Sequence, residues 1–168
     1  GYAGEMHADA GIYIWNRHAL AFWQERLNTI HCPLELKRNE WYSLFKEECF
    51  EKMIYGRIPM MVTANCVAKT TDKCRHGNET TIVQLTDRYK KQFPVALDCV
   101  YCMNIIYNSV PLSLHKDVAE GDAKYTKKLA FTVESGTETS AILTFFEKMS
   151  MGESVSPPFK EYTTAHEK

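Results

Sequence analysis

Strand-like and helix-like segments alternate along the first third of the chain, and this alternation constrains the fold more than any other feature. Short runs rich in β-branched and aromatic residues cover 11–15, 29–32 and 50–55. Between them, 17–26 and 38–48 have the apolar spacing of helices. Strands that alternate with helices at intervals of about 20 residues form right-handed βαβ units around a parallel sheet. The pattern therefore predicts an α/β fold, with a (β/α) barrel or part of one as its architecture.

The middle third of the chain interrupts this alternation. A polar stretch covers 60–82, and two strands are expected at 81–85 and 93–97. The last third returns to α/β character, with a strand at 129–133 and a helix at 137–149 that Thr137 is expected to cap. The expected organisation is βα units over 1–60, a small cysteine-rich insertion over 61–110, a closing strand and helix over 111–150, and a loose tail over 151–168.

Four of the six cysteines bracket the insertion: Cys66, Cys74, Cys99 and Cys102. A Cys-x-x-Cys pair brings two thiolates close enough to bind one metal, and a second pair can complete four-fold sulfur coordination. Such a set suits tetrahedral zinc or a four-iron four-sulfur cluster, and the spacing does not separate the two. Four reduced cysteines without a ligand are the remaining alternative. Cys32 and Cys49 lie among apolar residues and are expected to be buried side chains rather than ligands.

A second group of candidates comes at the ends of expected strands: Asn16, Glu35, Arg57 and Glu134. The carboxyl ends of parallel strands meet at one edge of a sheet, where ligands bind in barrels and in open sheets alike. These four are therefore candidate catalytic residues. The structural alternative is that Glu35 and Arg57 cap helices and pair with each other.

Charge and composition narrow the classes of function. The net charge of -1 argues against a nucleic-acid binder that works through bulk charge, although a local basic patch stays open. The sequence has neither a Gly-x-Ser-x-Gly elbow nor a His-Glu-x-x-His pattern, so nucleophilic hydrolysis has little support. No apolar run is long enough to cross a membrane, and the first residues lack the pattern of a signal peptide. A cytoplasmic location with reduced thiols is expected.

Five short motifs occur in an order that resembles one family. They are IWN at 14–16, PLEL at 33–36, YGRIPMMVTANC at 55–66, DCVYC at 98–102 and FTVES at 131–135. Together they resemble the collagenase-like peptidases, peptidase unit U, family 32. Members of that family are longer, so the resemblance implies the C-terminal part of such a protein, with the closing units of a TIM-like barrel. Missing barrel strands would leave a sheet edge unpaired, which favours self-association.

The resemblance also implies a chemistry. Some members are described as collagen-degrading, whereas others hold a four-iron cluster on four cysteines and take part in hydroxylation of RNA or of a quinone precursor. Cys66, Cys74 and Cys99 match the cluster cysteines by position, and Cys102 is the expected fourth. The expectation is therefore an iron–sulfur enzyme acting on RNA or on a small-molecule quinone precursor. A peptidase acting on protein substrates and a structural zinc module without catalysis are the alternatives.

Overall fold

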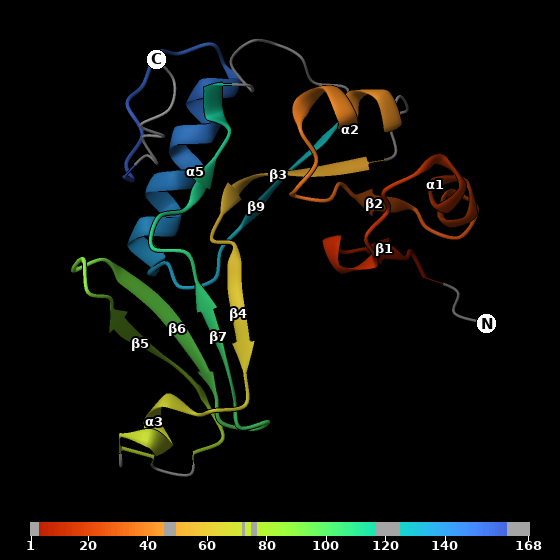
Figure 1. Cartoon of the computed structure of the whole chain (residues 1–168). Helices are drawn as coiled ribbons and strands as arrows, with labels where there is room; N and C mark the ends of the chain where they lie inside the picture. Colours follow the sequence, from red (N-terminus) through yellow and green to blue (C-terminus); the bar gives the residue numbers. More distant parts are fainter. Residues whose placement is uncertain (1–3, 46–49, 72, 75–76, 117–124, 161–168) are drawn as a thin grey trace. The chain divides into compact units, whose positions relative to one another are not determined.

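The computed structural model describes residues 4–45, 50–71, 73–74, 77–116 and 125–160. The chain divides into two compact units. Unit 1 consists of Gly1–Tyr55 and Leu114–Ala130, and unit 2 consists of Gly56–Ser113 and Phe131–Lys168. Figure 1 shows the course of the chain and the labels of its elements.

Unit 1 is built on parallel strands. Its elements are β1 (His7–Ala8), the short 3-10 helix η1 (Ala10–Ile12), α1 (Arg17–Gln24), β2 (Thr29–His31), α2 (Arg38–Leu44), β3 (Phe50–Gly56) and β9 (Thr126–Ala130). β1, β2 and β3 pair in parallel in that order, and β9 pairs with β3. The parallel pairing agrees with the strand–helix spacing of the sequence.

Aromatic side chains form much of the core of unit 1. Trp41 on α2 is buried against Phe50 on β3 and against Tyr125, with ring centroids 5.8 and 5.4 Å away. The Lys52 ammonium lies 4.0 Å from the Trp41 ring centroid. Buried aromatic rings contribute large apolar areas, so this cluster ties α2 to the sheet.

Unit 2 is built on an antiparallel sheet. Its elements are β4 (Pro59–Thr63), α3 (Val67–Thr70), β5 (Thr80–Thr86), β6 (Gln92–Asp98), β7 (Met103–Tyr107), β8 (Leu112–Ser113) and α5 (Gly136–Ser150). The sheet has the order β4-β7-β6-β5. The centre of β6 is buried at Val95, Ala96 and Leu97, as expected of an inner strand.

The hairpin of β5 and β6 has an uninterrupted register from Thr80 opposite Asp98 to Thr86 opposite Gln92. Its turn is organised by Asp87, whose Oδ1 accepts hydrogen bonds from the backbone N–H groups of Tyr89 and Lys91, both at 2.8 Å. Aspartate at this position is typical of turns because its side chain replaces a backbone acceptor.

The α5 helix begins earlier than the sequence pattern predicts. Its N-cap is Ser135 rather than Thr137, and Ser135 forms a capping box with Glu138. Ile142, Phe145 and Phe146 are buried along one face of the helix, at the spacing of an amphipathic helix. The Phe145 ring meets Phe159 edge-on, with centroids 5.6 Å apart, so part of the expected loose tail packs against α5.

The expected TIM-like barrel is wrong. The described residues form two small sheets with no closed barrel, and the sheet of unit 2 is antiparallel. The segment read as a strand at 11–15 is instead a 3-10 turn that ends at Tyr13 in a left-handed conformation. The stretch read as polar at 60–82 contains β4. The cysteine-bracketed region is therefore no small insertion, because its strands form the main sheet of unit 2.

None of the helices in the described part of the chain has the length and apolar character needed to span a membrane.

Candidate functional site

The sheet of unit 2 brings the four bracketing cysteines to one of its ends. β4 and β6 both run antiparallel to β7, so the last residues of β4 and β6 lie beside the first residues of β7. Cys66 follows β4, and Cys99 and Cys102 lie in the turn between β6 and β7. Because β5 runs antiparallel to β6, the segment that contains Cys74 enters the sheet at the same end. Figure 1 shows α3 and the β6–β7 turn there.

The Cys99–Cys102 turn is shaped by its own backbone and by one carboxylate. Asp98 Oδ1 accepts hydrogen bonds from the N–H groups of Val100, at 3.0 Å, and Tyr101, at 3.1 Å. Cys102 has a φ of 51°, in the left-handed region that L-residues other than Asn and Asp seldom adopt. These contacts give the turn a tight, specific conformation.

Cys66 is fixed through its backbone at the start of α3. Its carbonyl accepts hydrogen bonds from both the N–H and the Oγ1 hydroxyl of Thr70, each at 3.0 Å. This double contact sets the direction in which the chain enters the helix.

Electrostatics also link the four thiols. Partial removal from water raises the pKa of Cys99, and the charges of Cys66, Cys74 and Cys102 raise it further, followed by that of Asp98. Thiolates that would repel one another in this way favour a bound cation. Within the described ranges, however, no three His, Cys, Asp or Glu side chains already stand in the arrangement of a metal site. Metal binding therefore requires the cysteine side chains to draw closer together.

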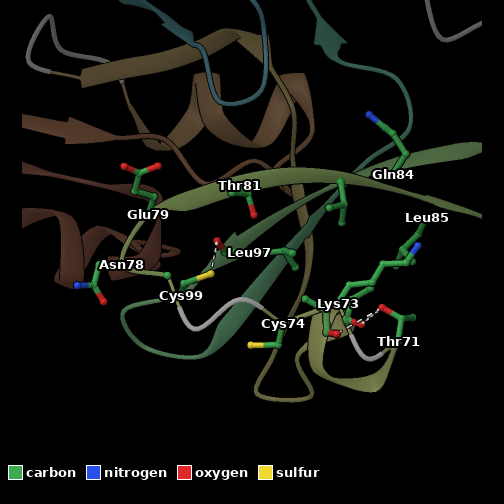
Figure 2. A pocket seen from close by; sticks show the side chains of 14 residues that line it. Thr71, Lys73, Cys74, Asn78, Glu79, Thr81, Gln84, Leu85, Leu97 and Cys99 are labelled. Atoms are coloured by element: carbon green, nitrogen blue, oxygen red, sulfur yellow. Dashed lines mark hydrogen bonds between the residues drawn. The ribbon is translucent and has the colours of Figure 1, made fainter.

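A cavity of about 760 Å³ adjoins the cysteines. Its apolar lining comes mainly from the α3 segment and from strands β5 and β6. Cys74 and Cys99 line it together with Lys73 (Figure 2). The Cys99 thiol also faces the carbonyl of Leu97, with 4.0 Å between sulfur and oxygen. A ligand in this cavity would lie directly beside two of the four cysteines, and the volume suits a small molecule.

Arg57 and Glu134, two of the four candidate catalytic residues, are brought together in unit 2. Arg57 Nη1 donates to the carbonyls of Asn108 and Ser109, both at 2.8 Å. Its Nε lies 3.7 Å from Glu134 Oε1 and is buried, with no hydrogen-bond partner among the described residues. Glu134 Oε2 accepts from the N–H groups of Thr132 and Val133 at 2.8 and 3.1 Å. Arg57 and Glu134 thus contact each other, and each also binds the backbone of a loop of unit 2.

Asn16 and Glu35, the other two candidates, belong to unit 1. Asn16 caps α1, because its Oδ1 accepts a hydrogen bond from the N–H of Ala19 at 2.9 Å. It also lines an open hollow of about 560 Å³ whose other walls include residues of α2. Glu35 is exposed and is not among the residues that line this hollow. The structure thus gives Asn16 a clear structural role as a helix cap.

Cys32 is a buried side chain, as expected from its apolar surroundings. Burial raises its pKa to about 11, against a smaller opposing effect of Lys52. Cys49 lies outside the described residues.

Sequence reasoning missed a cluster of charged groups in unit 1. His31 Nδ1 lies 3.1 Å from Glu51 Oε1, and the Lys128 ammonium lies 3.1 Å from the same oxygen. Lys128 also lies 3.6 Å from Asp9 Oδ1. The register of the parallel strands brings His31 and Glu51 side by side, but the residues are far apart in sequence and share no motif.

It also missed Asn104, which is fully buried on β7. The available signal was a polar residue between apolar neighbours just after the Cys-x-x-Cys pair. A polar side chain at an inner strand position requires hydrogen-bond partners.

Comparison of the chain with protein families, with curated proteins and with solved structures finds no match in any of the three.

Proposed function

We propose that Cys66, Cys74, Cys99 and Cys102 bind a four-iron four-sulfur cluster, in an enzyme of the collagenase-like peptidase family that catalyses a hydroxylation. The observation that carries the proposal is the strand order of the unit 2 sheet, which brings cysteines from three separate loops to one end. Four thiols are the donor set of iron–sulfur clusters and of structural zinc. A reducing, cytoplasmic compartment is part of the proposal, since it keeps such thiols available.

The chain's own residues prepare this site in stages. Asp98 shapes the Cys99–Cys102 turn, because its carboxylate accepts two backbone hydrogen bonds between these two cysteines. Each thiol must lose its proton to become a ligand, so metal binding releases protons. A bound four-iron cluster would supply one-electron transfer.

The adjoining cavity supports a small substrate over an RNA strand. Its described lining combines Lys73 with polar and apolar side chains. A largely apolar wall from Val83, Leu85 and Leu97 suits an aromatic or isoprenoid compound, such as a quinone precursor, better.

The test is metal analysis of the whole chain after purification without oxygen. We expect iron and acid-labile sulfide, with visible absorption that is lost in Cys66→Ser. Cys32→Ala is the matched control, since it removes a buried cysteine of unit 1 and should leave the iron content unchanged.

Two results would contradict this proposal. A colourless protein with tightly bound zinc on the same four cysteines would establish the structural zinc module. Cleavage of gelatin by a protein free of iron, retained in Cys66→Ser, would establish the peptidase.

A further inference from the structure

We propose that Asn104 is the positioning residue of the metal centre: its side-chain amide fixes the loop of Cys66 against the Cys99–Cys102 turn. This inference rests on the proposed centre and concerns how the site is assembled. Asn104 lies on β7, shortly after Cys102, and its side chain is fully buried.

Three hydrogen bonds connect this one amide to the backbone on both sides of Cys66. Nδ2 donates to the carbonyl of Thr63 at 3.1 Å and to the carbonyl of Asn65 at 2.7 Å. Oδ1 accepts from the N–H of Val67 at 3.4 Å. The residues before and after Cys66 are therefore both held by a side chain of the strand that begins at the opposite cysteine pair.

The register of the sheet explains why this position can reach both loops. Asn104 is opposite Thr63 on β4 and opposite Leu97 on β6. It therefore occupies the middle strand, between the strand that leads to Cys66 and the strand that leads to Cys99.

The chemistry of the contacts requires an amide. Two donors and one acceptor are used on one planar group, and asparagine supplies both in a fixed geometry. An aspartate of the same shape has no donor for the carbonyls of Thr63 and Asn65, and an aliphatic side chain has neither donor nor acceptor. Buried carbonyls left without a donor would shift the loop toward other partners.

Removal of the amide should therefore release Cys66 and leave the other three cysteines in place. Residues that orient metal ligands through hydrogen bonds, without binding the metal themselves, typically change metal affinity by about 10- to 100-fold when they are replaced. We expect a loss of this size in Asn104→Asp and in Asn104→Ala, together with a weaker thiolate-to-metal charge-transfer absorption.

The experiment titrates Co²⁺ into the whole reduced chain without oxygen, in competition with a chelator. Co²⁺ binds tetrahedral thiolate sites, and its absorption reports how many thiolates bind. The two Asn104 variants are compared with Asn28→Ala, which changes an exposed asparagine of unit 1 and should leave affinity unchanged.

A double-mutant cycle with Cys66→Ser separates positioning from general destabilisation. If Asn104 acts through Cys66, Asn104→Asp should lower the Co²⁺ affinity much less in the Cys66→Ser background than in the natural chain. Equal losses in both backgrounds would overturn the inference. Circular dichroism identifies any variant that fails to fold, and the isosteric aspartate variant carries the test if the alanine variant does so.

The inference and the proposed centre fail in different ways. Tight four-thiolate Co²⁺ binding that is identical in the natural chain and in both Asn104 variants would overturn only the role of Asn104. Absence of thiolate binding in the natural chain would overturn the metal centre, and with it the positioning role.

Discussion

At the scale of single residues, one group of charged side chains in unit 1 is connected by close contacts: Asp9, His31, Glu51 and Lys128. Glu51 is the clearest case, because its carboxylate contacts both His31 and Lys128 at 3.1 Å. Burial alone would raise the pKa of Glu51, but the hydrogen bonds and charges of these two partners outweigh it, so the pKa lies below its ordinary value. The ionised form is therefore favoured by folding.

This shift predicts how stability depends on pH. A carboxyl group whose pKa is lowered in the folded state stabilises the fold above its unfolded pKa, near 4.5, and loses that contribution as pH falls through the lower folded value. Glu51→Gln should lower the free energy of unfolding at pH 7 and flatten its decline below pH 4.5. Urea unfolding across this range measures both effects.

Glu25→Gln is the control for Glu51→Gln. Glu25 pairs with Arg26 at the surface, where ion pairs contribute little. If Glu51→Gln left the slope below pH 4.5 as steep as in the natural chain, the His31–Glu51–Lys128 contacts would not stabilise the fold through ionisation.

At the scale of elements, local sequence signals located three helices, α1, α2 and α5, and four strands, β2, β3, β5 and β6. They missed β1, β4, β7 and β8, and they gave no information on which strands pair. The pattern predicted strands near β5, β6 and β3, since these are long and apolar or alternating. β4 was missed because its short apolar run of Met60, Met61 and Val62 opens the stretch 60–82, which is polar over most of its length. Strand pairing depends on residues far apart in the chain, so the antiparallel order of unit 2 could not be deduced from local periodicity.

In the candidate site, too, local sequence patterns identify some residues, whereas the contacts of others depend on strand pairing. The four cysteines that we propose as ligands were singled out by their spacing, because a Cys-x-x-Cys pair is a local pattern. Asn104 and the Glu51 contacts depend on register, which no local pattern contains. Asn16 was recognised by its position after an apolar run, but its observed contact is that of a helix cap.

The start of α5 provides a direct test of an element boundary. Ser135 Oγ accepts a hydrogen bond from the N–H of Glu138, whose carboxylate accepts in return from the N–H of Ser135. Ser135→Ala should destabilise unit 2 by about 1 kcal/mol, as measured by chemical denaturation. Thr137→Ala, two positions into the helix, should be neutral or slightly stabilising. The reverse order of effects would favour Thr137 as the cap.

At the scale of the whole molecule, the unit 2 sheet has two edges, at β4 and β5. β4 is free of charged residues, and three consecutive side chains on it, Met60, Met61 and Val62, are 57–60% exposed. Apolar, uncharged edge strands pair readily with other strands. We therefore expect the chain to self-associate at high concentration.

Val62→Lys should reduce this association, because a lysine on an edge strand opposes strand pairing. Sedimentation velocity over a range of concentrations measures the effect. Tyr89→Lys adds the same charge at the exposed β5–β6 turn and should change nothing. Equal dissociation in both variants would mean that net charge, and not the β4 edge, controls association.

The β5–β6 hairpin has a consequence for the order in which unit 2 assembles. Its strands pair through one short turn, so loop closure costs little and the hairpin can form within microseconds. β4 must instead find β7 across a separation of 41 residues, from Thr63 to Asn104. During synthesis β4 leaves the ribosome before its partner β7, so it cannot pair until β7 has been made. The cysteines of the β6–β7 turn and of the segment before β5 are therefore expected to meet first, and Cys66 arrives last, with the strand that completes the sheet.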